Sequence, residues 1–176
     1  MSLPPSTLVL GGAASGKSLY AENLIRDIGG NPVYIATAEA LDEEMQKKIA
    51  LHRKRRGDQW RAVEEPLSLV DALKDHDSAD AAILVDCLTL WLSNLLANGR
   101  DVVGETDKLV QALPTLSASV VFVSNELGLG VVPENVAARQ FRNLHGVMNQ
   151  SVAVAVEHVI FVTAGLPSIL KGVSGR

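Results

Sequence analysis

The chain has 176 residues and a formal net charge of −4, from 16 Lys and Arg against 20 Asp and Glu. That length suits one domain with a substantial core. Hydrophobic residues make up 47% of the chain but aromatic residues only 4%, so the core must be built from Ala, Val, Leu and Ile. Such a core, with 14 glycines, favours buried parallel strands alternating with helices over an aromatic-rich β-sandwich.

The composition also excludes several classes of protein. A single cysteine, Cys87, rules out an internal disulfide and a cysteine-rich zinc site. No apolar run reaches the ~18–20 residues of a membrane span. The N-terminal residues lack the basic and apolar pattern of a secretory signal, so we expect a cytoplasmic protein. The acidic net charge argues against nucleic-acid binding by the whole surface.

Short apolar strands alternate with helices along the whole chain. In chain order the patterns predict strand Thr7–Leu10, helix Lys17–Ile28, strand Val33–Ala36, helix Asp42–Arg56, helix Pro66–Lys74, strand Ala81–Val85, helices Leu88–Ala97 and Thr106–Leu113, strand Val120–Ser124, helix Asn135–Val156 and strand His158–Thr163. Five buried strands separated by helices predict parallel βαβ units with right-handed crossovers. No linker interrupts them, so we assign residues 1–176 to one domain.

The first predicted strand runs directly into a glycine-rich motif. Residues 11–18 read Gly-Gly-Ala-Ala-Ser-Gly-Lys-Ser and match the phosphate-loop (P-loop) pattern G-x-x-x-x-G-K-[ST]. Its glycines let backbone N–H groups turn inward around a phosphate chain, and the following helix directs its positive N-terminal end at the same anion. A chance match in a βα turn is the alternative, but the flanking strand and helix favour a nucleotide-binding loop. The predicted nucleotide-binding residues here are Gly11, Gly12, Ala13, Ala14, Ser15, Gly16, Lys17 and Ser18.

A P-loop works with a metal ion and a second acid. Lys17 is suited to bridge the β- and γ-phosphates, and the Ser18 hydroxyl to coordinate Mg²⁺. Asp86 follows the buried strand Ala81–Val85, and ligand groups lie at strand ends in open α/β sheets. The alternative is that Asp86 only caps the helix that begins at Leu88. Paired with the P-loop, Asp86 is predicted to be a magnesium ligand.

Residues 52–56, His-Arg-Lys-Arg-Arg, form the densest charge cluster of this acidic chain. Three interpretations stay open: a solvated helix end, a nucleic-acid contact that lacks interleaved aromatic residues, or a phosphate site. His52 continues an apolar stripe at intervals of four, four and three, so it is expected to face the protein body and approach a nucleotide. Most histidines in such a position are only packed. The other histidines have no comparable setting and are expected to be structural: His76, His145 and His158.

Several short motifs together resemble one enzyme family. Beside the P-loop they are Tyr34-Ile35-Ala36-Thr37, Asp42-x-Glu44-Met45, His52-Arg53, the run from Val85 to Trp91, Arg139-x-Phe141-Arg142 and Asn149-Gln150. The most specific is Asn-Glu-x-Gly-x-Gly-x-Val-Pro-Glu-Asn at residues 125–135. Over about residues 7–172 the chain closely resembles the bifunctional adenosylcobinamide kinase/adenosylcobinamide-phosphate guanylyltransferases of cobalamin biosynthesis. The resemblance implies a P-loop NTPase-type three-layer α/β fold with a mostly parallel central sheet.

The resemblance implies two reactions at a shared nucleotide region. GTP or ATP phosphorylates adenosylcobinamide, and GTP then donates GMP to that phosphate through a guanylyl-histidine, giving adenosylcobinamide-GDP and pyrophosphate. The histidine of the family's motif is His52 here, so His52 and Lys17 are the expected catalytic residues. The family also implies a homo-oligomer, with a trimer favoured. Beyond the P-loop, the implied nucleotide-binding residues are Ala36, Thr37, Ala38, Arg53, Lys54, Arg55, Arg56, Glu64 and Asp86.

The chain departs from the family pattern at Ala14, where relatives often have Arg. Because phosphate cradling relies on backbone N–H groups and Lys17, we expect nucleotide binding to survive. For the run Asn125–Asn135, substrate contact and subunit contact both stay open. Two other functions stay open as well: a P-loop kinase of another small alcohol, with His52 only packed, and a nucleotide-switched regulatory module. A switch needs no histidine beside a basic cluster, which speaks against the second.

Overall fold

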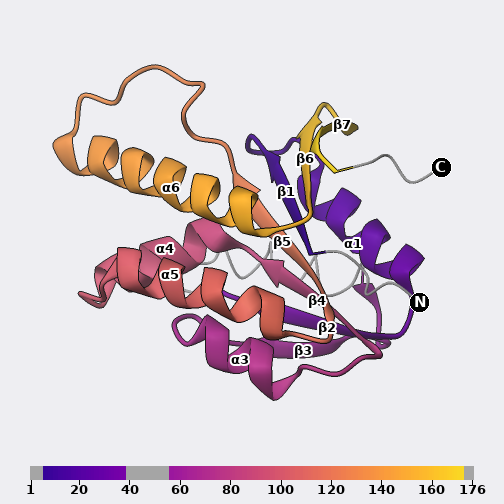
Figure 1. Ribbon diagram of the computed structural model, residues 1–176. Coiled ribbons are helices and arrows are strands. Elements are labelled where there is room, and N and C mark those ends of the chain that lie inside the picture. Colours follow the sequence, from indigo (N-terminus) through magenta and orange to yellow (C-terminus); the bar gives the residue numbers. More distant parts are fainter. Residues whose placement is uncertain (1–5, 39–55, 173–176) are drawn as a thin grey trace.

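A computed structural model describes residues 6–38 and 56–172, which form a three-layer α/β fold (Figure 1). Its seven-stranded sheet has the order β3-β2-β4-β5-β1-β6-β7. All neighbouring strands are parallel except β6 and β7, which pair antiparallel. The mostly parallel α/β architecture expected from the sequence is therefore confirmed. The strands are β1 Thr7–Gly11, β2 Asn31–Ala36, β3 Arg61–Glu64, β4 Ala81–Asp86, β5 Ser119–Asn125, β6 His158–Thr163 and β7 Leu166–Lys171.

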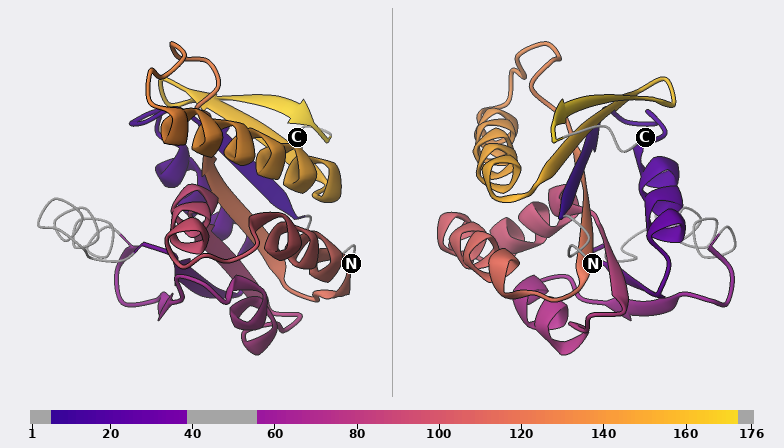
Figure 2. Two further views of the ribbon diagram at one scale, coloured as in Figure 1. Left: turned by 90° about the vertical axis from the view of Figure 1, so that its left-hand side faces the viewer. Right: turned by 45° about the vertical axis from the view of Figure 1, so that its right-hand side comes forward.

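Helices cover both faces of the sheet. Within the described residues, α1 lies on one face and the other helices lie on the opposite face (Figure 2). None of these helices is long and apolar enough to cross a membrane. The helices are α1 Lys17–Ile28, α3 Leu69–Asp75, α4 Leu88–Ala97, α5 Val102–Ala112, the 3₁₀ turn η1 Leu113–Thr115, and α6 Val136–Ala155.

The alternation of side chains along the central strands builds two apolar cores. In β1, Leu8 and Leu10 face the larger core under α3 to α6, whereas Val9 faces the smaller core under α1. In β5, Phe122 faces the larger core and Val121 the smaller one. Since both faces are covered, the central strands read as continuous apolar runs in the sequence, which is typical of parallel sheets. These apolar runs are the reason that the central strands could be predicted from the sequence.

The five predicted strands are present, but the sheet has two more. The expectation of five strands missed β3 and β7 because both lie at sheet edges and expose most of their side chains. An edge strand needs no apolar run, and β7 even contains Pro167, which edge strands tolerate. Helix α3 begins at Leu69 rather than Pro66, and α5 begins at Val102 rather than Thr106. The predicted helix Asp42–Arg56 lies outside the described residues except at Arg56.

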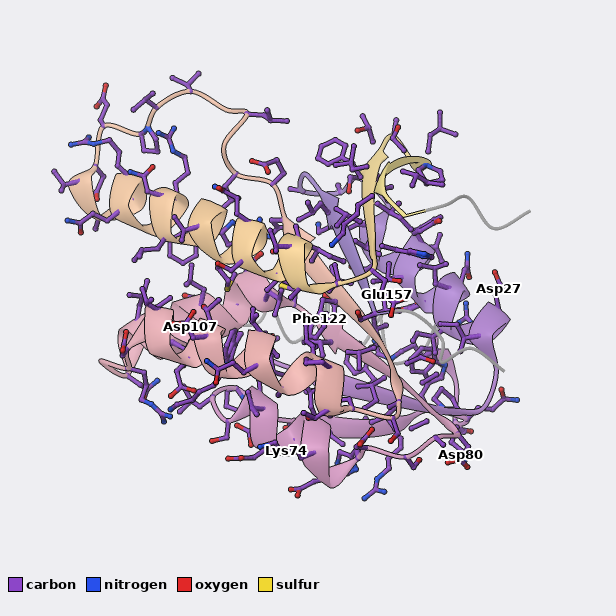
Figure 3. The ribbon with its side chains drawn as sticks, in the orientation of Figure 1. Asp27, Lys74, Asp80, Asp107, Phe122 and Glu157 are labelled. Carbon is purple, nitrogen blue, oxygen red and sulfur yellow. The ribbon has the colours of Figure 1, made fainter. Side chains whose placement is uncertain are left out.

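Phe122 tests how strongly the central strand supports the fold. It has no exposed surface and lies in the interior between the sheet and the α4–α6 layer (Figure 3). We expect Phe122→Ala to lower the free energy of unfolding by about 3–5 kcal/mol, because it leaves a cavity in a packed core. Urea denaturation measures this. The matched control, Val154→Ala, truncates a side chain that is 80% exposed and should change the free energy by less than about 0.5 kcal/mol. Equal effects of the two substitutions would contradict the assigned core.

Candidate functional site

Three neighbouring strands bring polar groups to one edge of the sheet. Asp86 ends β4, Asn125 ends β5 and Gly11 ends β1. Gly11 lies opposite Asn125 in the parallel register, whereas Asp86 lies opposite Val123. The backbone N–H of Glu126 donates to the carbonyl of Gly11 at 3.0 Å. Thus the predicted P-loop and the predicted metal ligand flank β5, at the carboxyl edge where ligands bind in such sheets.

The loop between β1 and α1 has the backbone of an anion-binding turn. The N–H of Ser15 donates to the carbonyl of Gly12, and both Ala14 and Gly16 have positive φ angles, 55° and 93°. Turns of this kind point successive N–H groups toward one concavity. The loop leads directly into α1, which begins at Lys17. The side chain of Ala14 is exposed, so the family's Arg at this position is not needed to shape the turn.

The hairpin between β6 and β7, which was not predicted from the sequence, contacts the P-loop. The turn between β6 and β7 contains Ala164 and Gly165, both with positive φ, and the N–H of Gly165 donates to the carbonyl of Ser15 at 2.8 Å. A side chain on Gly16 would lie 3.1 Å from the Cα atom of Gly165. The close approach explains why the P-loop needs glycine at position 16 beyond its backbone angle. The adjacent glycine turn is the sequence signal that could have revealed the hairpin.

Lys17 lies inside the site with its charge partly desolvated. Its ammonium group donates to the carbonyl of Gly12 at 3.0 Å. Burial lowers the pKa of Lys17, while the nearby Cys87 and Asp86 oppose this shift. A phosphate in the loop offers the ammonium group a charged acceptor in place of the Gly12 carbonyl, and charge-assisted hydrogen bonds are stronger. The structure therefore places the Lys17 ammonium group against the backbone of the P-loop.

Asp86 is positioned by β2 as well as by β4. The hydroxyl of Tyr34 donates to Asp86 Oδ2 at 3.4 Å, and the N–H of Thr37 donates to the Asp86 carbonyl at 3.3 Å. The alternative role as helix cap is wrong, because the N-cap residue of α4 is Cys87. The Asp86–Cys87 peptide bond is cis.

The oxygen donors present fit a magnesium ion. Within the described part of the chain, no group of three or more His, Cys, Asp or Glu could hold a metal ion. Mg²⁺ does not need such a group, because it is usually bound by one or two carboxylates, substrate phosphates and retained water. Asp86 and Ser18 supply one carboxylate and one hydroxyl, and the remaining ligands would come from nucleotide and water.

Thr37, which follows β2, is hydrogen-bonded to the backbone of the residue after Asp86. Thr37 is fully buried, and its hydroxyl donates to the carbonyl of Cys87 at 2.7 Å and accepts from the N–H of Cys87 at 2.8 Å. Asn94 donates to the carbonyl of Thr37. Thus Thr37, predicted to bind nucleotide, fixes the residue after Asp86. Ala38 is half-buried beside it. Glu64 is exposed and lies opposite Ala36 in the β2–β3 register, at the same edge of the sheet.

Arg56 is buried rather than free to face solvent. Its guanidinium carbon lies 3.3 Å from the ring centroid of Tyr34, and its Nη1 atom is 3.7 Å from Glu22 Oε1. Burial raises the pKa of Tyr34, with Asp86 adding to the shift, so this phenol stays protonated at neutral pH. Arg56 therefore connects α1, β2 and the end of the basic cluster. The other predicted residues of that cluster lie outside the described residues: His52, Arg53, Lys54 and Arg55.

Sequence reasoning also missed a buried polar cluster beneath Asn125. It consists of Thr89, Ser124, His145 and Asn149, all of them buried. His145 and Asn149 are four residues apart and hence share one face of α6, a spacing that could have revealed them as a pair. Burial lowers the pKa of His145.

Comparisons with known proteins agree over nearly the whole chain. A family model described as "Cobinamide kinase / cobinamide phosphate guanyltransferase" matches residues 7–170. The chain is 47% identical over 167 residues to "Bifunctional adenosylcobalamin biosynthesis protein CobP" of Pseudomonas aeruginosa, covering 94% of this chain and 96% of that protein. It is 37% identical over 179 residues to "Bifunctional adenosylcobalamin biosynthesis protein CobU" of Escherichia coli, covering 93% and 98%.

Solved structures share the fold at low sequence identity. The assembled ATPase EscN of the enteropathogenic E. coli type III secretion system matches with a TM-score of 0.60 and 12% identity, over 97% of this chain and 48% of that one. The P4 protein of bacteriophage phi6, solved with ADP, matches with a TM-score of 0.51 and 16% identity, over 93% and 53%. This chain spans about half the length of each. These likenesses show a P-loop NTPase fold.

Replacing Arg56 tests whether its contacts with Tyr34 and Glu22 stabilise the protein. We expect Arg56→Ala to lower the free energy of unfolding by about 3 kcal/mol, because it removes a cationic partner of the buried Glu22. Urea denaturation measures the loss. Arg61→Ala, at an exposed position on β3, serves as the control and should change stability by less than about 0.5 kcal/mol. A stable Arg56→Ala protein that binds nucleotide more weakly would instead favour direct contact between Arg56 and nucleotide.

Proposed function

Since the chain belongs to the cobinamide kinase/cobinamide phosphate guanyltransferase family, we propose that its two reactions use one nucleotide site at the carboxyl ends of β1, β4 and β5. The observation that carries this proposal is the placement of the P-loop and Asp86 on either side of the end of β5. Two reactions in a single domain of 176 residues leave little room for separate nucleotide sites. We propose that residues 1–176 form one domain. We propose further that the protein acts in the cytoplasm and has no nucleic-acid partner.

In the first reaction, GTP or ATP donates its γ-phosphoryl group to the hydroxyl of adenosylcobinamide. The hydroxyl oxygen bonds to the γ-phosphorus, the bond to the β-phosphate oxygen breaks, and the hydroxyl proton is released. The P-loop amides and Lys17 hold the phosphate chain and stabilise the charge that develops on it. Desolvation around Lys17 supports this role, because charges act more strongly away from water.

In the second reaction, His52 carries GMP. A neutral imidazole nitrogen attacks the α-phosphorus of GTP, and pyrophosphate leaves. An oxygen of the cobinamide phosphate then attacks the same phosphorus and the nitrogen–phosphorus bond breaks, which gives adenosylcobinamide-GDP. Arg56 supports this assignment, because it is anchored on Tyr34 beside Asp86 and is four residues from His52 in the chain. Arg53, Lys54 and Arg55 are proposed to neutralise nucleotide phosphates.

We assign the remaining predicted residues to metal binding, nucleotide binding or support of the site. Ser18 and Asp86 would hold Mg²⁺, which supplies charge neutralisation at the nucleotide phosphates when it is bound. Ala36 ends β2 at the same edge, Thr37 and Ala38 follow it, and Glu64 lies there at the end of β3. Glu64 is proposed to bind nucleotide because the family implies it.

A homo-oligomer, with a trimer favoured, is proposed for the working enzyme. The segment after β5 and the edge strand β7 both expose apolar side chains, and exposed apolar patches mark contact surfaces. In the first segment these side chains are Leu129, Val131, Val132 and Val136, and in β7 they are Leu166, Ile169 and Leu170. This supports subunit contact as one role of Asn125–Asn135.

The transfer of GMP separates this function from a kinase of another alcohol. With GTP labelled at the α-phosphate and Mg²⁺ present, we expect label on the protein that is acid-labile, alkali-stable and absent from His52→Ala. Phosphorylation of adenosylcobinamide should stay within about tenfold of wild type in that variant, because it needs no covalent carrier. Lys17→Ala should lower both rates by about a hundredfold, since it removes a phosphate contact from both reactions.

His76→Ala is the matched control, because His76 is the C-cap residue of α3, which does not border the P-loop, and should leave the labelling unchanged. An unlabelled wild-type protein, or equal loss of both activities in a folded His52→Ala protein, would overturn the proposal. Nucleotide turnover that ignores adenosylcobinamide would favour a regulatory switch.

The proposed oligomer can be tested by introducing a charged side chain into the proposed subunit interface. Val131 is 95% exposed in the described chain, so Val131→Asp should not affect folding, yet it should dissociate subunits that bury this side chain. Sedimentation velocity should show a trimer for wild type and smaller species for the variant. Val103→Asp, at a 55% exposed position on α5, is the control and should remain a trimer. A wild-type monomer, or a trimer unaffected by Val131→Asp, would contradict this interface.

A further inference from the structure

The end of β5 extends beyond its neighbour β4. The last paired residue of β4, Asp86, lies opposite Val123, so no strand partner faces Asn125 on that side. The N–H and C=O groups of a strand residue point to the same side, and buried backbone groups need partners. Here two side chains replace the missing strand: Thr89 Oγ1 accepts from the N–H of Asn125 at 2.9 Å, and Asn149 Nδ2 donates to the C=O of Asn125 at 3.0 Å.

His145 holds those two side chains together. Its Nε2 atom is 2.9 Å from Thr89 Oγ1 and 3.2 Å from Ser124 Oγ, and its Nδ1 atom is 3.4 Å from Asn149 Nδ2. Ser124 Oγ in turn donates to Asn149 Oδ1 at 2.7 Å. The four side chains come from α4, β5 and α6, so the cluster connects three elements that are distant in the sequence.

The hydrogen-bond directions are consistent with one arrangement. Asn149 Nδ2 can only donate, so His145 Nδ1 accepts and His145 Nε2 carries the hydrogen. Nε2 then donates to the hydroxyls of Thr89 and Ser124, which leaves the hydrogen of Ser124 for Asn149 Oδ1. With His145 neutral in this tautomer, each of these contacts joins a donor to an acceptor. Matched donors and acceptors in a buried network of this kind hold its members in fixed positions.

The next peptide connects this network to the P-loop. Glu126 follows Asn125, and its N–H points to the opposite side, where it donates to the carbonyl of Gly11. By alternation with Val121 and Val123, which pack under α1, the side chain of Asn125 belongs to the face of the sheet that carries the P-loop and α1. The end of β5 is therefore held between the network on one side and the nucleotide loop on the other.

We propose that the network of Thr89, Ser124, His145 and Asn149 is a positioning device that fixes the end of β5 beside the P-loop for phosphate transfer. His145 and its partners act through Asn125 and Glu126 and do not touch the nucleotide. The proposal concerns the same site as the proposed function and rests on it for the kinetic readout only.

The test removes one hydroxyl without changing side-chain volume. Thr89→Val deprives the N–H of Asn125 and His145 Nε2 of their shared acceptor, whereas Thr89→Ser retains it. Thr106→Val is the matched control, because Thr106 is also buried and its hydroxyl donates to the carbonyl of Val102 rather than to a member of this network. The measurements are hydrogen exchange at the Asn125 and Glu126 amides, and kcat and KM for phosphorylation of adenosylcobinamide.

In Thr89→Val we expect both amides to exchange at least about tenfold faster and kcat to fall about tenfold, with KM for nucleotide changed less than about threefold. The KM is preserved because the P-loop and Lys17 stay intact. Thr89→Ser should recover most of both losses, and Thr106→Val should show neither at equal thermal stability.

Unchanged exchange at Asn125 and Glu126 in Thr89→Val, or an equal fall of kcat in Thr106→Val, would overturn the proposal. If Thr89→Val does not fold, Ser124→Ala replaces it, with the same expected changes in exchange and kcat. If wild-type protein fails to phosphorylate adenosylcobinamide, the proposed function fails, while the exchange measurement still decides whether the network holds the strand end.

Discussion

The pairing of three parallel strands, β4, β5 and β1, is the constraint on which the rest of the site depends. Parallel pairing brings their carboxyl ends to one edge, and this strand order puts a single strand between Asp86 and the P-loop. Because both faces of these strands are covered, their positions are fixed by two apolar cores. The separation between the P-loop and Asp86 is thus set by the sheet.

Unequal strand lengths create a second requirement. Where one strand ends before its neighbour, backbone groups lose their partners and side chains must replace them. Thr37 does so for Cys87 after β4, and Thr89 with Asn149 does so for Asn125 at the end of β5. The ends of the strands that carry the site are therefore held by buried polar side chains. Rigid placement of this kind is what phosphate transfer needs, because the protein contributes mainly position and electrostatic stabilisation.

Sequence patterns predicted the parts of the molecule that depend on local signals. The buried strands, the loop between β1 and α1 and the position of Asp86 at a strand end could be predicted because an apolar run or a motif marks each of them. The edge strands β3 and β7 were missed because exposed strands carry no such run. His145 was expected to be only structural, since nothing local connects it to Thr89, 56 residues away in the chain. Arg56 was predicted to bind nucleotide with the rest of the basic cluster, and only the fold shows that it packs on Tyr34 and lies near Glu22.

The most direct test of the central claim is a crystal structure of the protein with Mg²⁺ and a non-hydrolysable GTP analogue. We expect the β- and γ-phosphates within hydrogen-bond distance of the Gly11–Ser18 amides and Lys17, with the metal between Ser18 and Asp86. Asn125, which ends β5 between β4 and β1, would then lie beside the γ-phosphate. Phosphates bound away from the ends of β1, β4 and β5 would contradict the account.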